Sequence, residues 1–292
     1  MIDGFECIRV DCGDISLSVH RAGQGEPLLL LHGYPQNHHC WGKVAPQFAQ
    51  NFDVIVPDLR GYGDSDAPPD DELHTVYAKR TMANDIAHLM DKLGIAQAHI
   101  LGHDRGGRVA YRFALDHPER VKKLGIIEIV PTGDFWAHWN ADLALKGYHW
   151  TFLAQPYPLP ERMIGADPAA YIEWTLAAWT LSKSLDVFSP EALQSYCAQA
   201  ADPAHLHAMC ADYRAGATYD RRLDEAETGR ISAPLHFLWA ESGFPAHTGD
   251  PSAIWRKWAT YVSDTSCISG HFAMEENPQA VLDAFIPFFT AG

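Results

Sequence analysis

The chain has 292 residues, of which 47% are hydrophobic and 20% charged, enough to bury a large core as one domain with an insertion or as two modest domains. Its formal net charge of −15 argues against binding to nucleic acid or to an anionic membrane surface, because both repel a negatively charged protein. Any anionic ligand must therefore be held by positive charge concentrated at one place.

The N-terminal residues lack a basic stretch followed by an apolar core, and no apolar run approaches the roughly 20 residues of a membrane span. We therefore expect a cytoplasmic protein that does not enter a membrane. The six cysteines lack the Cys-x-x-Cys spacing of a zinc site, so reduced thiols are expected rather than disulfides or a metal centre. We expect no cofactor.

The N-terminal part of the chain alternates strand-like and helix-like patterns. Apolar strands and an amphipathic helix follow one another, as a right-handed parallel sheet with crossover helices requires. The third strand ends in the glycine turn His32-Gly33-Tyr34-Pro35, where the Tyr34 amide can serve as an oxyanion donor. The predicted elements are strands at 5–10, 15–21, 27–31 and 53–58 and helices at 41–49 and 77–93.

Between Ala98 and Tyr111 a short apolar strand runs into a Gly-x-Asp-x-Gly-Gly turn and then directly into a helical pattern. This is the sequence form of a nucleophile elbow, in which Asp104 occupies the position where hydrolases more often carry serine. Glycines at positions 102, 106 and 107 suit a strained nucleophile backbone and close packing of the strand against the helix. The alternative is an ordinary strand-to-helix turn in which Asp104 only caps the helix.

The rest of the chain contains further strands and one long interruption. An apolar strand at 121–130 carries Glu128 near its end, and a buried carboxylate there needs a partner such as a histidine. From 132 to 222 the strand pattern stops, and helix-like segments rich in tryptophan predict an inserted helical cap. The core domain then comprises 1–131 and 223–292, with strands at 234–239 and 261–268, His271 after the last strand, and a helix at 278–289.

Asp104, Glu128 and His271 follow one another in the order nucleophile, acid, histidine, each at the end of a predicted strand. This order predicts the α/β-hydrolase fold, a mostly parallel eight-stranded sheet flanked by helices, here with an inserted helical cap. A carboxylate nucleophile can displace a leaving group from an sp³ carbon and form an alkyl-enzyme ester. His271, oriented by Glu128, would then activate the water that hydrolyses the ester, while the Tyr34 and Arg105 amides stabilise the oxyanion.

An aspartate nucleophile on this fold leaves halide displacement and epoxide opening as the two candidate reactions. Arg105 and Arg108 lie three residues apart at the start of the elbow helix, so both can hold a substrate carboxylate beside the nucleophile. In the predicted cap, His149, Trp150 and Tyr213 can donate hydrogen bonds to a leaving group from a dry pocket.

Short motifs spread over nearly the whole chain carry a family resemblance. They are His32-Gly-Tyr-Pro-Gln-Asn, Asp58-Leu-Arg-Gly-Tyr-Gly-Asp-Ser, Gly102-His-Asp-Arg-Gly-Gly-Arg, Ala114-Leu-Asp-His-Pro, His149-Trp, Met163-Ile-Gly, Asp212-Tyr-Arg-Ala and Gly270-His-Phe. With them, the chain resembles the haloacetate (fluoroacetate) dehalogenases of the α/β-hydrolase superfamily. The resemblance implies that a small anionic haloacid is converted to glycolate and halide, and that the protein is a homodimer.

By the same resemblance, Asp104 is the nucleophile and His271 the base, Arg105 and Arg108 form the carboxylate clamp, and His149, Trp150 and Tyr213 hold the halide. One position departs from the family pattern, because the acid after the sixth strand is an aspartate in the relatives and Glu128 here. Its hydrogen bond to His271 is therefore expected to shift, with Asp134 and Glu241 as rival acids.

The sequence also allows two other functions. An epoxide hydrolase would use two cap tyrosines, for which Tyr148, Tyr157 and Tyr213 are available, but the paired arginines would then have no role. A receptor or binding protein on the same fold would be expected to have a damaged nucleophile or base. Both residues are intact, which favours an enzyme.

Overall fold

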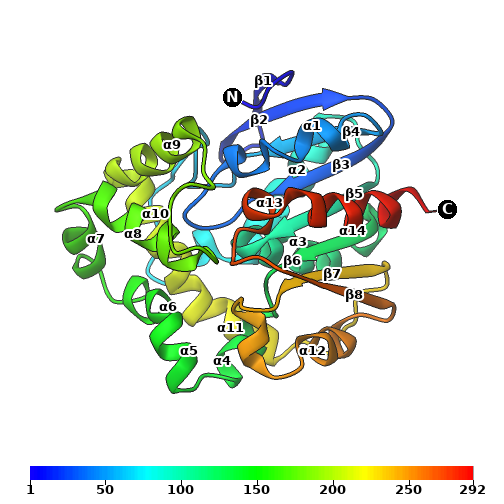
Figure 1. Cartoon of the computed structure of the whole chain (residues 1–292). Helices are drawn as coiled ribbons and strands as arrows, with labels where there is room; N and C mark the ends of the chain where they lie inside the picture. Colours follow the sequence, from blue (N-terminus) through cyan, green and yellow to red (C-terminus); the bar gives the residue numbers. More distant parts are fainter. Residues whose placement is uncertain (292) are drawn as a thin grey trace.

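The computed structural model describes residues 1–291 and shows a central sheet with helices packed around it and a second group of helices to one side (Figure 1). The eight strands have the order β1-β2-β4-β3-β5-β6-β7-β8. The pairs β1–β2 and β2–β4 are antiparallel and the others are parallel, which confirms the predicted fold. The strands are β1 (Glu6–Asp11), β2 (Ser16–Gly23), β3 (Glu26–Leu31), β4 (Phe52–Pro57), β5 (Ala98–His103), β6 (Val121–Ile127), β7 (Leu235–Ala240) and β8 (Val262–Cys267).

The middle of the sheet is covered on both faces. Every residue of β5 is buried, and β3, β4 and β6 are buried over most of their length, as expected for parallel strands with helices on each side. The core part of the chain forms η1 (His38–Trp41), α1 (Ala45–Phe48), η2 (Thr75–Tyr77), α2 (Lys79–Lys92), α3 (Asp104–Asp116), η3 (Pro118–Arg120), η4 (Pro245–Thr248), α12 (Pro251–Trp258), α13 (Ala273–Glu276) and α14 (Pro278–Thr290).

Helices fill the stretch between β6 and β7, at the left and lower left of Figure 1. They cover the range 132–222 that the sequence assigns to a cap, although the status of this part as a separate domain stays a prediction. The helices are α4 (Thr132–Ala137), α5 (Ala141–Lys146), α6 (Tyr148–Leu153), α7 (Leu159–Ile164), α8 (Pro168–Trp179), α9 (Pro190–Ala201), α10 (Pro203–Ala217) and α11 (Tyr219–Glu225).

Two local differences from the sequence-based prediction bear on the site. The helix expected at 41–49 is only the short α1 after the 3₁₀ turn η1, because Gly42 and Pro46 interrupt a continuous helix. The strand expected at 121–130 ends at Ile127, and Glu128 adopts a left-handed backbone with φ of 60°. Among residues 1–291, no helix combines the length and the apolar character needed to cross a membrane.

Candidate active site

Asp104 stands at the sharp turn between β5 and α3. Its φ of 47° lies in the left-handed region, a strained conformation for a residue with a Cβ and a feature of nucleophile elbows. The turn is packed tightly, because a Cβ added to Gly106 would fall 2.2 Å from the His32 carbonyl oxygen. The cap position of α3 is His103, which makes no side-chain cap bond, so the reading of Asp104 as a simple helix cap does not describe this turn.

The two oxygens of the Asp104 carboxylate have different surroundings. Oδ1 accepts a hydrogen bond of 2.8 Å from the backbone amide of Tyr34, the residue predicted to supply an oxyanion donor. A Cβ added to Gly33 would lie 2.5 Å from this Oδ1 and 2.7 Å from the Arg105 amide nitrogen, so that amide faces the same glycine. Oδ2 lies 3.7 Å from Nε2 of His271 and accepts no hydrogen bond among the described residues.

Asp104 is buried, with 6% of its surface exposed. Burial alone would raise the pKa of its carboxyl group, but interactions with His271 and His103 and with the charges of Arg105 and Arg108 outweigh burial and lower that pKa. The carboxylate is therefore ionised at neutral pH, which is the form that a nucleophile requires.

His271 follows β8 and lies beside Asp104 in the wall of the same small cavity. Its backbone amide donates to the Trp179 carbonyl at 2.9 Å, and its own carbonyl accepts from His103 Nε2 at 2.8 Å. Burial, followed by the nearby His103, lowers the pKa of His271 to about 3. The imidazole is thus neutral and able to accept a proton from water.

Glu276, which sequence reasoning did not select, holds the loop that carries His271. Its carboxylate accepts hydrogen bonds from the amides of Gly270 at 2.9 Å and Phe272 at 3.0 Å, on either side of the histidine. It also accepts from the amide of Leu181 at 2.7 Å, just after α8. An acid five residues after the histidine and inside a short helix is the only sequence signal for this role.

Glu128 does not make the hydrogen bond to His271 that the sequence predicts. Its Oε2 accepts from the Ala240 amide at 2.5 Å, while its Oε1 and the Nδ1 of His271 are both without a partner among the described residues. Gly243 packs against this carboxyl group so closely that a Cβ there would fall 1.5 Å from Oε1. Burial raises the pKa of Glu128 well above its usual value, which favours the protonated form of this carboxyl group.

The two rival acids have other partners. Asp134 accepts a hydrogen bond of 2.6 Å from the indole nitrogen of Trp258. Glu241 is exposed and accepts from the Ser266 hydroxyl at 3.0 Å. Neither contacts His271, so Glu128 stays the acid that shares a cavity with the histidine.

Arg105 and Arg108 are both buried beside Asp104, as the predicted clamp requires. Part of each guanidinium group already has a partner in the protein. Arg105 pairs with Asp212 through Nε and Nη2, and Arg108 donates from Nη1 to the Val130 carbonyl at 3.0 Å. Each also keeps one nitrogen without a partner in the described chain, Nη1 in Arg105 and Nε in Arg108. Unpaired guanidinium nitrogens in a buried site are suited to binding an anion.

Asp212 holds Arg105 in an ion pair, a contact that the sequence did not predict. It is fully buried on α10 and pairs with both Arg105 and Lys79, while Tyr62 donates to its other oxygen at 2.9 Å. Burial opposes ionisation, but the two cations lower the pKa of Asp212 to about 2. The motif Asp212-Tyr-Arg-Ala contained the residue, but nothing in the sequence linked it to an arginine 107 positions earlier.

The three predicted halide-binding residues converge above the clamp. The rings of His149 and Tyr213 have centroids 5.5 Å apart, and those of Trp150 and Tyr213 are 5.6 Å apart. The Tyr213 hydroxyl and the His149 Nδ1 are buried and have no partner in the described chain. Leaving a buried polar group unpaired costs free energy, so both groups are poised for a ligand.

The cavity in front of Asp104 is small, with a volume of about 10 Å³, which is close to the lower limit for one water molecule. Asp104, Glu128 and His271 contribute to its wall from the sheet side, and His149 and Trp150 from the helical side. The structure therefore brings the predicted catalytic and cap residues around one point, in a form that must open for any substrate to enter.

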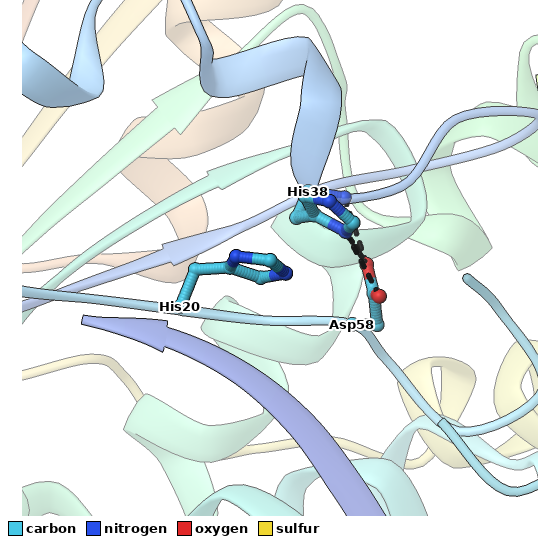
Figure 2. A group of neighbouring side chains, drawn as sticks. All are labelled: His20, His38 and Asp58. Atoms are coloured by element: carbon cyan, nitrogen blue, oxygen red, sulfur yellow. Dashed lines mark hydrogen bonds and ion pairs between the residues drawn. The ribbon is translucent and has the colours of Figure 1, made fainter. Parts of the chain in front are cut away.

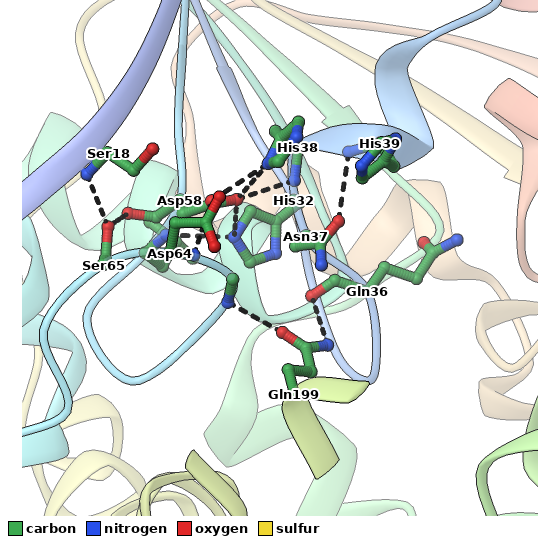
Figure 3. A network of polar contacts seen from close by, with 12 residues as sticks. Ser18, His32, Gln36, Asn37, His38, His39, Asp58, Asp64, Ser65 and Gln199 are labelled. Carbon is green, nitrogen blue, oxygen red and sulfur yellow. Dashed lines mark hydrogen bonds and ion pairs between the residues drawn. The ribbon is translucent and has the colours of Figure 1, made fainter. Parts of the chain in front are cut away.

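Behind the Tyr34 turn, a polar network fixes the loops that follow β3 and β4 (Figure 3). Asp58 accepts from the backbone amides of His38 at 2.8 Å and Asp64 at 3.0 Å. His32, which was expected to be structural, accepts from the Leu59 amide at 3.0 Å. Gln199 of α9 donates to the Pro35 carbonyl at 2.6 Å, so the cap helices also help to hold this turn.

His20, His38 and Asp58 in this region offer nitrogen and oxygen atoms within 4.8 Å of one another, as a metal site would (Figure 2). The rings of His20 and His38 are stacked, with centroids 3.8 Å apart and planes 22° apart. Nitrogen lone pairs lie in the ring planes, so those of stacked rings do not converge on one ion. The arrangement instead fits a structural role, in which His20 packs on His38 and His38 Nδ1 binds Asp58 at 2.9 Å.

The tyrosines that an epoxide hydrolase would need are not gathered at the site. The Tyr148 hydroxyl contacts that of Tyr171 at 3.4 Å, and Tyr157 is 68% exposed. Of the three candidates, only Tyr213 has a buried hydroxyl without a partner in the described chain. These three candidates therefore supply one buried tyrosine hydroxyl without a partner among the described residues, rather than two.

A family model described as the alpha/beta hydrolase fold matches residues 26–278. A fluoroacetate dehalogenase from Burkholderia sp. is 40% identical over 95% of this chain and 91% of that protein. A soluble epoxide hydrolase from Corynebacterium sp. strain C12 is 34% identical over 92% of this chain and 91% of that protein. Among solved structures, a protein from Nostoc sp. PCC 7120 provisionally described as an α/β hydrolase is 45% identical, with a TM-score of 0.97 over 100% of both chains.

Proposed function

Because this chain belongs to the haloacetate (fluoroacetate) dehalogenase family of the α/β-hydrolase superfamily, we propose that it hydrolyses a small haloacid, such as fluoroacetate or chloroacetate, to glycolate and halide. The observation that carries this proposal is the pair of buried arginines with unpaired nitrogens beside an aspartate at the elbow. A carboxylate substrate accounts for the arginines, and an aspartate nucleophile accounts for attack on a saturated carbon.

In the first step, Oδ2 of Asp104 attacks the carbon that bears the halogen, the carbon–halogen bond breaks, and halide leaves with the bonding electrons. The product is an ester between Asp104 and the acetate unit. Oδ1, held by the Tyr34 amide, becomes the carbonyl oxygen of this ester and already lies where an oxyanion donor can stabilise it. No proton is transferred in this step.

In the second step, Nε2 of His271 takes a proton from a water molecule whose oxygen attacks the ester carbonyl carbon. The negative charge that develops on Oδ1 is stabilised by the amides of Tyr34 and Arg105. Collapse of the tetrahedral species breaks the bond to the glycolate oxygen, restores the Asp104 carboxylate and returns the proton through His271. Water and haloacid are thus converted to glycolate, halide and a proton.

The cap and clamp residues have separate roles in this proposal. Arg105 and Arg108 orient the substrate carboxylate, and His149, Trp150 and Tyr213 donate to the departing halide. Glu128 is the acid that lines the same cavity as His271; burial raises its pKa, and no hydrogen bond joins the two residues. A homodimer belongs to the same proposal and is tested by sedimentation equilibrium of the purified protein.

The experiment that tests the reaction is a single turnover of chloroacetate in ¹⁸O-labelled water, followed by mass spectrometry of the peptide containing Asp104. We expect the label in Asp104 and unlabelled glycolate, because water attacks the enzyme carboxyl group. Label found directly in the first glycolate would contradict the ester. Asp104→Asn should abolish halide release, and styrene oxide serves as the control substrate, because its turnover in place of chloroacetate would assign the protein to epoxide hydrolysis.

A further inference from the structure

A second cavity lies directly beside the closed site. Its volume is about 210 Å³, and its wall includes His271 and Phe244, which also line the small cavity in front of Asp104. We call this space the vestibule. Because the site itself has almost no free volume, and the two spaces share two wall residues, the vestibule is the natural approach to the catalytic base.

The vestibule is positively charged. Lys146, at the end of α5, and Lys183, in the loop after α8, are part of its wall, and among residues 1–291 no aspartate or glutamate contributes to that wall. Lys146 contacts the Nε2 of His247, and Lys183 donates to the Ala178 carbonyl at 2.6 Å. Neither lysine forms a salt bridge within the described chain.

The two ammonium groups also act on each other. Partial burial and then the charge of Lys183 lower the pKa of Lys146, with Asp142 acting in the opposite direction. Two like charges that line one cavity and form no salt bridge within the described chain are stabilised by a bound anion. This local charge is unusual in a chain whose formal net charge is −15, because the protein as a whole repels small anions.

Aromatic rings separate the vestibule from the nucleophile. The ring of Trp179 lies 5.6 Å from that of Phe244 and 4.3 Å from that of His149, measured between centroids. Both Trp179 and Phe244 also pack on His271, at 5.5 Å and 5.2 Å. The Trp179 and Phe244 rings, both in the vestibule wall, therefore pack directly on the catalytic histidine.

From this geometry we propose that the vestibule is an anion-collecting antechamber, in which Lys146 and Lys183 bind the carboxylate of a small haloacid before it passes Trp179 and Phe244 into the site. The inference rests on the proposed function for the identity of the anion. In this proposal the two lysines capture the substrate and take no part in the chemical steps. The value of kcat therefore depends on the residues around Asp104 and not on the lysines.

The kinetic test compares chloride release from chloroacetate by the parent enzyme, Lys146→Gln, Lys183→Gln, the double variant and the charge reversal Lys183→Glu. We expect kcat/KM at low ionic strength to fall about three- to tenfold in each Gln variant and further in the other two, in line with steering by charge in a cleft. The kcat should stay unchanged, and the differences should shrink at about 0.5 M salt, where charges are screened. Lys257→Gln, at an exposed lysine of α12 outside the vestibule, is the matched control.

A second measurement does not depend on turnover. Trp174 belongs to the vestibule wall and is 58% exposed, so iodide should quench its fluorescence more effectively than the neutral quencher acrylamide. The Trp174 signal is isolated by comparison with Trp174→Phe. We expect the double lysine variant to lose about half of the iodide quenching and none of the acrylamide quenching, because the charge that attracts iodide has been removed.

Equal iodide quenching in the parent and the double variant would overturn the vestibule as an anion site. Equal kcat/KM values in those two proteins, with the parent active on chloroacetate, would overturn its role in capturing substrate. If the parent releases no halide from chloroacetate, the proposed function fails, while a difference in iodide quenching would still support anion binding at the two lysines. The two proposals are therefore distinguished by which measurement fails.

Discussion

Nε2 of His271 lies 3.7 Å from Oδ2 of Asp104, the carboxylate oxygen that the Tyr34 amide leaves free. The histidine therefore faces the nucleophile without being bonded to it, which leaves the carboxylate available for attack. The same position brings Nε2 close to the carbon that water would attack after the ester has formed. Asp104 can therefore act in the displacement step, and His271 in the later hydrolysis of the ester.

We expect His271→Asn to release about one halide per active site from chloroacetate and then to stop. The first displacement needs no base, whereas loss of the base should slow ester hydrolysis by roughly 10²–10⁴-fold. Quenched-flow measurement of chloride and the intact mass of the trapped protein check this result. A folded variant that lacks the first burst would show that His271 is needed for displacement as well.

In the parent enzyme, the hydrolysis of the alkyl-enzyme ester by His271 should be independent of pH between about 5 and 8. Burial and the nearby His103 lower the pKa of His271 to about 3, and the charge of Asp104 acts to raise it. Esterification removes that negative charge, so the pKa falls further and the imidazole stays neutral and basic across this range. Single-turnover rates across the pH range provide the measurement. A fall in rate below pH 6.5, the ordinary value for histidine, would contradict the environment described here.

Much of this site was predictable because its signals are local. Glycines at 102, 106 and 107 mark the elbow, and strand periodicity places Asp104 and His271 at strand ends. Parallel strands then bring those ends to one edge of the sheet. The prediction of the fold follows from the same alternation of strands and helices, and the eight-stranded sheet confirms it.

The contacts that the sequence did not reveal join residues far apart in the chain, and several residues of the same type could have formed each of them. The pairing of Asp212 with Arg105 spans 107 positions, and the chain contains 37 acidic residues that could have been the partner. The orientation of Glu128 depends on its backbone φ of 60° and on the lack of a side chain at Gly243. Neither property is expressed in the residue type of Glu128 itself.

Glu128→Gln should slow ester hydrolysis by no more than about tenfold, far less than the roughly 10⁴-fold loss expected when an ionised triad acid is neutralised. The reason is that the amide resembles the protonated carboxyl group that burial favours here. The unfolded chain releases this proton near pH 4.5, the ordinary pKa, whereas the native state keeps it to a higher pH. The contribution of Glu128 to the free energy of unfolding therefore falls as pH rises above 4.5. The stability of the variant relative to the parent should therefore increase from pH 5 to pH 9. Urea unfolding at both pH values tests the sign, and a variant destabilised equally at both would contradict it.

The two clamp arginines should respond differently to substitution. Arg108→Leu should cost about 2–5 kcal/mol in kcat/KM for chloroacetate, the range for breaking a buried charge pair, with a smaller effect on folding. Arg105→Leu removes the same kind of contact and also leaves Asp212 and Lys79 without one member of their buried ion network, so it should lower the thermal stability as well. Haloacetamide provides the control substrate. Equal loss of activity on chloroacetate and chloroacetamide would argue that the arginines do not recognise the carboxylate.

Tyr213→Phe should separate a role in halide release from a role in packing. The Tyr213 hydroxyl is buried without a partner among the described residues, so its removal should leave thermal stability unchanged or raise it. Fluoride is a poor leaving group, and a donor that strengthens as charge develops should contribute about 1–3 kcal/mol to its release, more than to that of chloride. We therefore expect fluoroacetate turnover to fall by about 10- to 100-fold and chloroacetate turnover to fall less.

The matched control for this substitution is Tyr111→Phe. The Tyr111 hydroxyl forms hydrogen bonds with Asp224 at 2.7 Å and with Thr132 at 3.1 Å, and among the described residues it forms no hydrogen bond to a proposed halide-binding residue, so its removal should lower the melting temperature and leave the ratio of the two turnover rates unchanged. Trp150→Phe and His149→Ala extend the test to the other proposed donors. An equal fall for fluoroacetate and chloroacetate in all three cap variants, accompanied by lower melting temperatures, would mean that these side chains pack the lid and do not bind the departing halide.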